Sequence, residues 1–386
     1  MPTLSPLHQR LARELEQRDA AGTRRRLTLP AAGLIDFSSN DYLGLSRHPA
    51  VQQALHQAAE AGAGSTGSRL LTGNSAEAEA LEQHLAQFHR AEAALLFNSG
   101  YAANLGFFAA VPRRGDTILY DEASHASVKD GIRSSFATAW SFRHNDVADL
   151  TRRLTQLQRA AGATVFVAVE AVYSMRGDVA PLQALVEVCE SYGAQLVVDE
   201  AHSVGVFGAG GEGLVTELHL EEQVLARVVT FGKALGGQGA AVAGPAILRD
   251  YLLNFSRPFI YTTALPRYTI AALLEAYRLL PEQHAARARL LALSDYLRRQ
   301  LQQVPQVQVP ADSRIIHPVQ LPGFSPMQVR ALAETIRAAG FDVRAIVPPT
   351  VPSGQQCLRV IVHSFNSEAE IKALVVVLKQ AVTHEQ

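Results

Sequence analysis

The feature that most constrains the fold is an alternation of short, continuous apolar runs with longer amphipathic segments. The runs lie at 93–98, 116–121, 164–172, 195–199 and 227–231. Such runs are typical of parallel strands that are buried on both faces of a sheet. The segments between them repeat apolar residues every three or four positions, as helices do; they span 76–90, 147–161 and 182–192. The sequence therefore predicts an α/β fold with a mostly parallel, doubly wound sheet.

The alternation ends near residue 280, where helical and extended patterns follow one another in a different order. The helical patterns span 283–303, 326–339 and 368–381, and the extended segments span 315–321 and 358–362. A chain of 386 residues also exceeds the size that one hydrophobic core usually organises, about 250–300 residues. We therefore expect an N-terminal segment at 1–45, a large domain at 46–280 and a small α+β C-terminal domain at 281–386.

Composition and charge argue against several classes of protein. Apolar residues make up 48% of the chain and charged residues 18%, a balance typical of globular proteins rather than disordered ones. The 35 basic and 36 acidic residues nearly cancel, so we expect no nucleic-acid partner and no polybasic membrane surface. Only two cysteines occur, and neither a signal peptide nor a membrane-spanning run is recognisable. We expect a cytoplasmic protein with reduced thiols.

Two familiar nucleotide-binding patterns are present only in part. The stretch G-A-G-G-E-G (208–213) satisfies G-x-G-x-x-G, but we expect it neither to open a helix nor to have the acidic partner that the fingerprint requires. Around Lys233, Arg227 and Ala234 replace the glycine and the hydroxyl residue of a Walker loop. The motifs G-x-S-x-G and H-E-x-x-H do not occur, so we expect no hydrolase of the first type and no metal site.

Polar residues that follow two of the apolar runs form the pattern that carries chemistry. Asp199 ends one run, with His202 three residues later, and Lys233 follows the run that ends at Thr230 and Phe231. Ligands gather beyond the carboxyl ends of parallel strands. An aspartate there can also cap a helix and a lysine can be a surface charge, but apolar neighbours would lower the pKa of the Lys233 amine. A neutral lysine opposite a carboxylate is what covalent chemistry with pyridoxal phosphate (PLP) requires.

Two further motifs fit a cofactor of this kind. In N-S-G-Y-A-A-N (98–104), Gly100 lies between a predicted strand and a helix, where backbone N–H groups and the helix dipole can bind a phosphate. In S-H-A-S (124–127), His125 follows another predicted strand, where an imidazole can stack on a ring. Each motif alone is also typical of an ordinary strand–helix turn or of a structural histidine. Together with the aspartate, histidine and lysine they predict a PLP site.

With these motifs in view, the sequence resembles the α-oxoamine synthases, which are PLP enzymes of fold type I. The resemblance runs through almost the whole chain. It is carried by F-S-S-N-D-Y-L-G-L (37–45), G-S-R-L-L-T-G-N (67–74), N-S-G-Y-A-A-N (98–104), D-E-A-S-H-A-S (121–127), V-D-E-A-H-S-V-G (198–205), T-F-G-K-A-L-G (230–236), P-P-T-V-P-S-G (348–354) and L-R-V (358–360). It implies a large cofactor-binding domain, a smaller C-terminal domain and a homodimer with shared active sites.

The resemblance also implies a role for each matching residue. Lys233 would bond the cofactor covalently and later move the substrate Cα proton, while Asp199 would keep the pyridine nitrogen protonated. His125 would stack on the ring and His202 would contact its phenolic oxygen. The remaining cofactor residues would be Gly100, Tyr101, Ser174, Thr230 and either Thr262 or Thr263, the last reaching a phosphate across the dimer interface. The substrates would contact Arg24, Asn40, Thr350 and Arg359, with Arg359 pairing with the amino-acid carboxylate.

The activity that the resemblance implies is an acyl transfer, the decarboxylative condensation of L-alanine with a pimeloyl thioester of coenzyme A or of an acyl-carrier protein. Three alternatives stay open: a sister synthase of the glycine C-acetyltransferase, 5-aminolevulinate or sphingoid-base type, an aminotransferase of the same fold, and a catalytically silent partner. Silent partners usually lack the lysine that is present here as Lys233.

Two positions depart from the family pattern. Val347 replaces an arginine that often precedes P-P-T-V-P, which bears on the choice of acyl substrate. Arg176 replaces an aspartate in S-M-D-G-D, which we interpret as surface variation.

Overall fold

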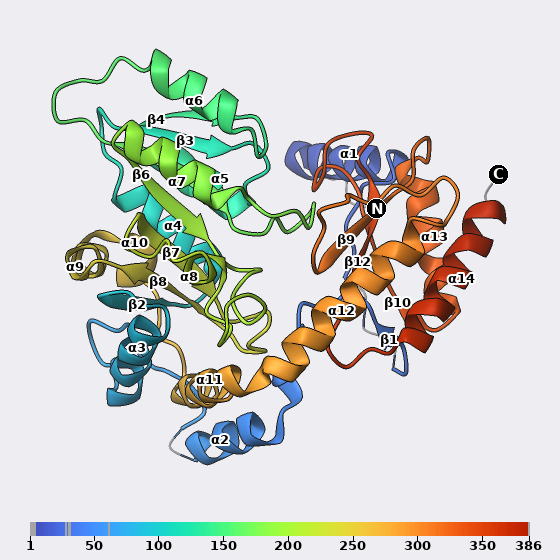
Figure 1. Ribbon diagram of the computed structural model, residues 1–386, viewed down its shortest axis with the longest axis horizontal. Coiled ribbons are helices and arrows are strands. Elements are labelled where there is room, and N and C mark those ends of the chain that lie inside the picture. Colours follow the sequence, from blue (N-terminus) through green and yellow to red (C-terminus); the bar gives the residue numbers. More distant parts are fainter. Residues whose placement is uncertain (1–4, 28, 30–31, 61, 385–386) are drawn as a thin grey trace. The chain divides into compact units, whose positions relative to one another are not determined.

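The computed structural model describes residues 5–27, 29, 32–60 and 62–384 (Figure 1). Their contacts divide them into two compact units. The large unit comprises Asn40–Ser174 and Asp178–Arg289, and the small unit comprises the described residues of Met1–Ser39, Met175–Gly177 and Leu290–Gln386. The small unit is thus assembled from stretches of chain that are far apart in the sequence.

The large unit is built, within the described residues, around a seven-stranded sheet with the order β2-β8-β7-β6-β5-β3-β4 (Figure 1). Its strands are β2 (Ala93–Phe97), β3 (Thr117–Asp121), β4 (Thr138–Phe142), β5 (Val165–Glu170), β6 (Ala194–Asp199), β7 (Val224–Thr230) and β8 (Ala240–Gly244). Neighbours from β7 to β4 are parallel, whereas β8 is antiparallel to both β2 and β7. This sheet confirms the α/β class predicted from the continuous apolar runs.

Helices and buried side chains cover this sheet. Phe107 and Val128 form one core with strand residues such as Val197, and the residues that alternate with that core, such as Leu196, are buried as well. The helices of the unit are α2 (Pro49–Ala59), α3 (Ala76–Phe88), α4 (Gly100–Ala110), α5 (Ala126–Arg133), α6 (Val147–Gln156), α7 (Leu182–Ser191), α8 (Leu214–Glu217), α9 (Ala246–Phe255), α10 (Arg257–Ile260) and α11 (Arg267–Leu279), with the 3-10 helices η1 (Leu45–Arg47) and η2 (Leu280–Gln283). Among the helices of the described part of the chain, none has the length and apolar character needed to cross a membrane.

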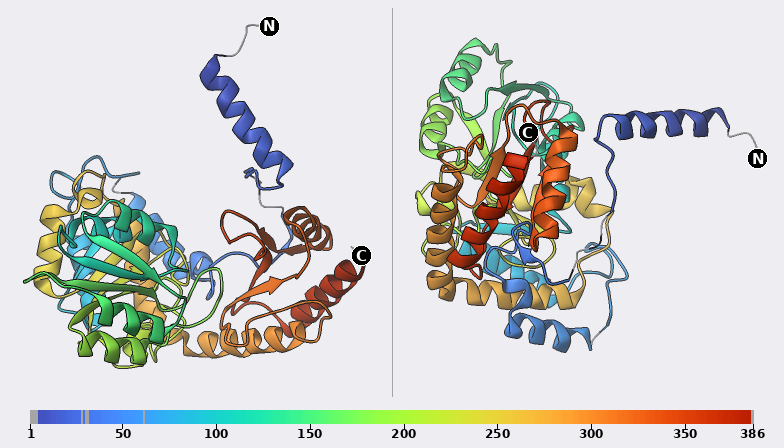
Figure 2. Two further views of the ribbon diagram at one scale, coloured as in Figure 1. Left: turned by 90° about the horizontal axis from the view of Figure 1, so that it is seen from above. Right: turned by 90° about the vertical axis from the view of Figure 1, so that its right-hand side faces the viewer.

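The small unit contains two short sheets among its described residues. Antiparallel β11 (Arg344–Ile346), β12 (Cys357–Ile361) and β9 (Ile316–Gln320) form one, and β1 (Ile35–Asp36) pairs in parallel with β10 (Phe341–Asp342) in the other. Its helices are α1 (Pro6–Ala20), α13 (Pro326–Ala338) and α14 (Glu368–His384), and α12 (His284–Leu301) contributes residues to both units (Figure 2). The start of α13 follows from local sequence, because Ser325 and Gln328 form a capping box and Pro326 occupies the first turn.

The structure corrects the sequence prediction at both ends of the large sheet, at β2 and β8 and at β4. Strand β8 has no predicted counterpart, because its sequence A-A-V-A-G is rich in residues with weak strand preference. Strand β4, at the edge beside β3, was also missed. The run at 93–98 was predicted as a parallel strand, but β2 pairs only with β8 within this sheet and is antiparallel to it.

Candidate active site

Asp199 lies at the carboxyl end of β6 in the middle of the large sheet, and only 7% of it is exposed. Its carboxylate accepts hydrogen bonds from Asn104 Nδ2 at 2.7 Å and from the Ala201 N–H at 2.9 Å. Asn104 reaches the carboxylate from α4. Two donors, one on each oxygen, hold the Asp199 carboxylate in a defined orientation.

Polar side chains join Asp199 to His125. Asn104 Nδ2 also donates to Ser127 Oγ at 3.0 Å, and that hydroxyl lies 2.8 Å from His125 Nδ1. His125 caps α5 by accepting the Ser127 N–H at 3.2 Å, and the residue as a whole is exposed. Partial burial lowers the pKa of His125, the Asp199 carboxylate opposes this shift and the Lys233 ammonium adds to it. The three groups predicted for the ring of the cofactor therefore act on one another electrostatically.

Lys233 follows β7 and is half-buried. Its Nζ donates to the hydroxyl of Thr230, the last residue of β7, at 3.3 Å. Thr230 in turn packs against the start of α4, because a Cβ on Gly100 would lie 2.5 Å from Thr230 Cγ2. The N–H groups of Gly100 and Tyr101 belong to the first turn of α4, where the helix itself offers no acceptor. The end of β7 and the start of α4 thus form a close-packed cradle suited to an anion.

His202 is buried three residues after Asp199, and its Nδ1 lies 2.6 Å from the hydroxyl of Tyr42. The same hydroxyl donates to Asn40 Oδ1 at 3.3 Å. The structure therefore brings Asn40 and His202 together through a tyrosine that the sequence interpretation did not single out, although Tyr42 stands in the motif N-D-Y-L-G.

Thr262 and Thr263 lie beside the strand–helix turn that precedes Gly100. Asn98 Nδ2 donates to the Thr263 carbonyl at 2.6 Å and to Thr262 Oγ1 at 3.4 Å. Tyr101 is exposed, and its hydroxyl donates to Asp130 at 2.6 Å. Within one chain, the turn that was predicted to bind phosphate and both candidate threonines are therefore neighbours.

Glu170, the last residue of β5, is a site residue that the sequence interpretation missed. It pairs with Asp199 of the neighbouring strand and is 3% exposed. Its two oxygens accept the N–H of His125 at 2.6 Å and that of Ser174 at 3.4 Å. Burial and the Asp199 charge raise the pKa of Glu170 to about 8. A carboxyl inside an otherwise apolar run, 164–172, gives no sign in the sequence of such contacts.

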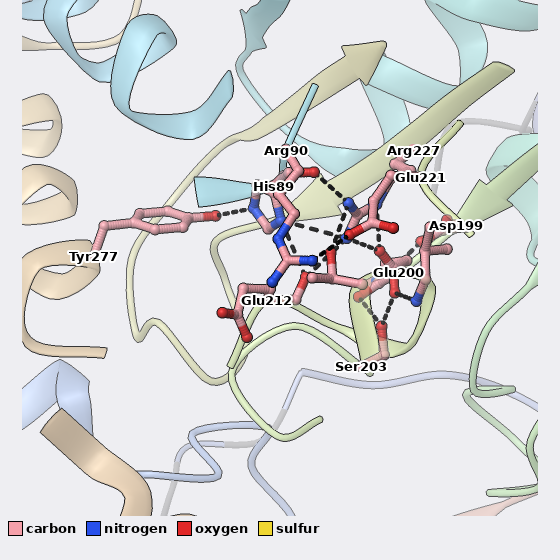
Figure 3. Close-up of polar contacts among 12 residues, drawn as sticks. His89, Arg90, Asp199, Glu200, Ser203, Glu212, Glu221, Arg227 and Tyr277 are labelled. Atoms are coloured by element: carbon pink, nitrogen blue, oxygen red, sulfur yellow. Dashed lines mark hydrogen bonds and ion pairs between the residues drawn. The ribbon is translucent and has the colours of Figure 1, made fainter. Parts of the chain in front are cut away.

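A buried ion pair involves Glu200, the residue after Asp199 (Figure 3). Arg227 Nε, on β7, donates to Glu200 Oε2 at 2.6 Å, and both side chains are almost completely inaccessible. The other oxygen of Glu200 accepts from Ser203 Oγ at 2.8 Å and from the Val215 N–H at 3.1 Å. The segment between Asp199 and Ser203, which carries His202, is thus anchored by the contacts of Glu200.

The glycine stretch 208–213 packs against the same ion pair. A Cβ on Gly213 would lie 2.5 Å from Glu200 Oε1, and Arg227 Nη2 donates to the carbonyl of Glu212 at 2.8 Å. Contrary to the sequence prediction, the stretch leads directly into a helix, the one-turn α8. Gly213 thus allows a close approach to Glu200.

The other predicted substrate residues belong to the small unit. Arg24 forms an ion pair with Asp19 at 2.5 Å, whereas Arg25 Nη2 donates to Thr350 Oγ1 at 3.2 Å. It is therefore Arg25, not Arg24, that contacts Thr350. Arg359 lies on β12 and is 8% exposed.

The two positions that depart from the family pattern differ in their surroundings. Val347 is buried, as an apolar side chain should be, so the position does not present a charge. Arg176 is exposed, in agreement with surface variation.

Comparison with known proteins agrees with this geometry. Residues 32–378 match the model of the family "Aminotransferase class I and II". The 8-amino-7-oxononanoate synthases of Emericella nidulans and Chromobacterium violaceum are each 42% identical to the chain; the matches cover 95% and 94% of this chain and 94% of each relative. A serine palmitoyltransferase of S. paucimobilis, solved with bound PLP–myriocin aldimine, superposes with a TM-score of 0.90 at 29% identity over 99% of both chains. The chain therefore belongs to the class I and II aminotransferase family, and within it to the α-oxoamine synthases.

Proposed function

We propose that the protein is a PLP-dependent acyltransferase that condenses L-alanine with a pimeloyl thioester to give 8-amino-7-oxononanoate, a step of biotin biosynthesis. The observation that carries the proposal is the grouping of Asp199, His125 and Lys233 at one edge of the sheet. The relatives that are 42% identical over nearly the whole chain support the choice of reaction.

The residues of the large unit fit PLP in shape and charge. The start of α4, where Gly100 leaves no room for a Cβ, suits the phosphate, and the backbone N–H groups of Gly100 and Tyr101 would bind it. Thr262 or Thr263, from a second copy of the chain, would add a hydroxyl. His125, an exposed residue, would stack on the cofactor, while Ser174 and Thr230 would complete the contacts.

When bound, PLP supplies an electron sink for the electrons released at the alanine Cα. Lys233 would hold the cofactor covalently and, once alanine has displaced it, remove the Cα proton with Nζ. Asp199, held by Asn104 and Ala201, would keep the ring nitrogen protonated. His202, whose Nδ1 side is held by Tyr42, would bind the phenolic oxygen through its other nitrogen. Condensation would release the thiol; loss of carbon dioxide and return of a proton to Cα would then give the product.

The substrates would be bound mainly by residues of the small unit. Arg359 would pair with the carboxylate of alanine, because a guanidinium matches a carboxylate in charge and shape. Asn40 would line the substrate side. Arg24 and Thr350 would meet the far end of the acyl chain, where pimeloyl thioester carries its second carboxylate.

We further propose a cytoplasmic homodimer with shared active sites, in which 46–280 form the cofactor-binding domain and 281–386 the small domain. Cys189 and Cys357 support a reducing compartment, because both are buried free thiols. Helix α1 supports association, because it buries none of its residues within its own chain.

A sister synthase is the second candidate, because the serine palmitoyltransferase superposes over nearly the whole chain. Thiol release measured over a grid of amino acids and acyl thioesters separates the two. We expect turnover to be highest with L-alanine and pimeloyl thioester. A preference for serine with palmitoyl thioester, or for glycine with acetyl thioester, would overturn the proposal. The same grid with coenzyme A and acyl-carrier-protein donors identifies the carrier.

A further inference from the structure

The carboxyl of Glu170 connects two parts of the candidate site that are separate in sequence. One oxygen accepts the N–H of His125 at 2.6 Å, at the loop between β3 and α5. The other accepts the N–H of Ser174 at 3.4 Å, four residues after Glu170 itself. Since each oxygen serves a different segment, this one carboxyl fixes the separation of the two segments.

Glu170 lies at the edge of the sheet where the candidate site is found. Glu170 ends β5 and pairs with Asp199 at the end of β6, so the clamped segments lie at the edge of the sheet where ligands gather. The side chain is 3% exposed, so water cannot readily replace the two contacts if the carboxyl is removed. His125 and Ser174 were both predicted to contact PLP.

We infer that Glu170 is a positioning residue for cofactor binding, which holds His125 and Ser174 at the separation that PLP requires. This inference rests on the proposed function, because it assumes that both residues contact PLP. Glu170 itself need not touch the cofactor. Its effect is expected on the affinity for PLP, not only on the stability of the fold.

Asp116 offers a matched control in the same sheet. It is 5% exposed, and its two oxygens accept the N–H of Arg113 at 2.9 Å and that of Thr164 at 2.8 Å. Asp116 and Thr164 directly precede β3 and β5, at the end of these parallel strands opposite to Glu170. Asp116 therefore also joins two segments through one backbone N–H on each oxygen, but away from the candidate site.

The test compares the full chain with the variants Glu170→Gln, Glu170→Ala and Asp116→Asn. Glutamine keeps one accepting oxygen and loses the other, so it should retain part of the clamp. PLP affinity is measured by equilibrium dialysis after removal of bound cofactor, and the stability of the cofactor-free chain by urea unfolding. We expect PLP to bind about fivefold more weakly to Glu170→Gln and at least about tenfold more weakly to Glu170→Ala. Asp116→Asn should lose stability but bind PLP as the unchanged protein does.

The outcomes separate the inference from the proposed function. If the unchanged protein does not bind PLP, the proposed function fails and the inference fails with it. If the unchanged protein binds PLP and the Glu170 variants bind it as tightly, or no more weakly than Asp116→Asn does, the inference alone is overturned. Should Glu170→Ala not fold, the comparison of Glu170→Gln with Asp116→Asn still decides.

Discussion

The buried carboxylates of the large unit differ in the groups that contact them. Glu200 is paired with the Arg227 guanidinium. Asp121 and Asp178 share the imidazole of His144. The hydrogen bonds described for Asp199, by contrast, come from uncharged amides. These donors orient the Asp199 carboxylate but do not neutralise its charge. The charge can therefore pair with a protonated ring nitrogen.

Replacing Asp199 tests this reasoning. Asp199→Asn keeps the size of the side chain but removes its charge. We expect kcat for thiol release to fall at least about 100-fold, which corresponds to about 3 kcal/mol. Alanine should still bind. Asp250→Asn, at an exposed aspartate, is the control and should not change kcat. Turnover of Asp199→Asn near that of the unchanged protein would show that Asp199 does not serve the ring nitrogen.

His144 gives a pH dependence to the stability of the large unit. Burial would lower the pKa of His144, but hydrogen bonds with Asp121 at 2.9 Å and Asp178 at 2.7 Å raise it to about 9. The folded state therefore holds the proton more tightly than the unfolded state, whose ordinary pKa is 6.5. The stabilisation is complete below this pH and is lost as the pH rises through 9.

The His144→Gln variant measures that contribution. It should lower the free energy of unfolding in urea by up to about 3 kcal/mol at pH 6 and by much less at pH 9.5. His56→Gln, at an exposed histidine, is the control and should show no such dependence. A loss that is the same at both pH values would contradict the raised pKa.

The choice of acyl substrate is tested at Arg24. A charged hydrogen bond to the distant carboxylate contributes about 1.5–3 kcal/mol, so Arg24→Ala should raise KM for pimeloyl thioester about ten- to hundred-fold. KM for alanine and for an uncharged thioester of similar length should change little. Arg25→Ala is the comparison variant: it removes the neighbouring arginine, which contacts Thr350, and leaves Arg24 in place. If both thioesters respond equally to Arg24→Ala, or if only Arg25→Ala raises KM, the assignment of Arg24 is wrong.

At the scale of helices and strands, the sequence predicted features that depend on local pattern and missed those that depend on contacts between distant residues. Asp199 and Lys233 were identified because they end or follow continuous apolar runs; β6 ends where its run predicted, and β7 ends at Thr230, just before the predicted end at Phe231. Asn104 was missed because it lies in the second turn of α4, where its spacing from Gly100 says nothing about an aspartate on β6. Strand β8 was missed because its residues have weak strand preference and its pairing with β2 joins segments that are far apart in sequence.

The contact between α4 and β7 can be tested by a pair of substitutions. Gly100→Ala would place a Cβ 2.5 Å from Thr230 Cγ2 and separate the helix start from the strand end. We expect PLP to bind at least about tenfold more weakly to this variant. Thr230→Ser removes Cγ2 but keeps the hydroxyl that accepts from Lys233. The double variant Gly100→Ala/Thr230→Ser should therefore regain much of the affinity, as measured by equilibrium dialysis. An unchanged affinity in Gly100→Ala, or no recovery in the double variant, would show that this contact does not shape the phosphate cradle.

For the molecule as a whole, our proposal includes association into a homodimer. Helix α1 exposes Leu7, Leu11 and Leu15, which recur every four residues on one side of the helix. Such a stripe on a helix that buries nothing in its own chain is typical of a surface covered by a partner.

Substituting the stripe tests whether α1 contributes to the dimer. Replacing all three leucines by serine should raise the dissociation constant of the dimer at least about tenfold, measured by sedimentation velocity over a range of concentrations. Arg10→Ser and Arg13→Ser, on the same helix, form the control variant. Unchanged sedimentation of the leucine variant would mean that α1 lies outside the interface.

The pairing of β1 with β10 has a consequence for how the chain folds during its synthesis. Ile35 lies opposite Phe341, so β1 is synthesised before the large unit and its partner β10 is synthesised after it. The residues of the large unit all precede Leu290, so that unit can complete its sheet earlier. Contacts between distant segments close slowly, because a long loop must be ordered first. The N-terminal part of the small unit therefore waits for its own C-terminal part, and chaperones have longest access to it.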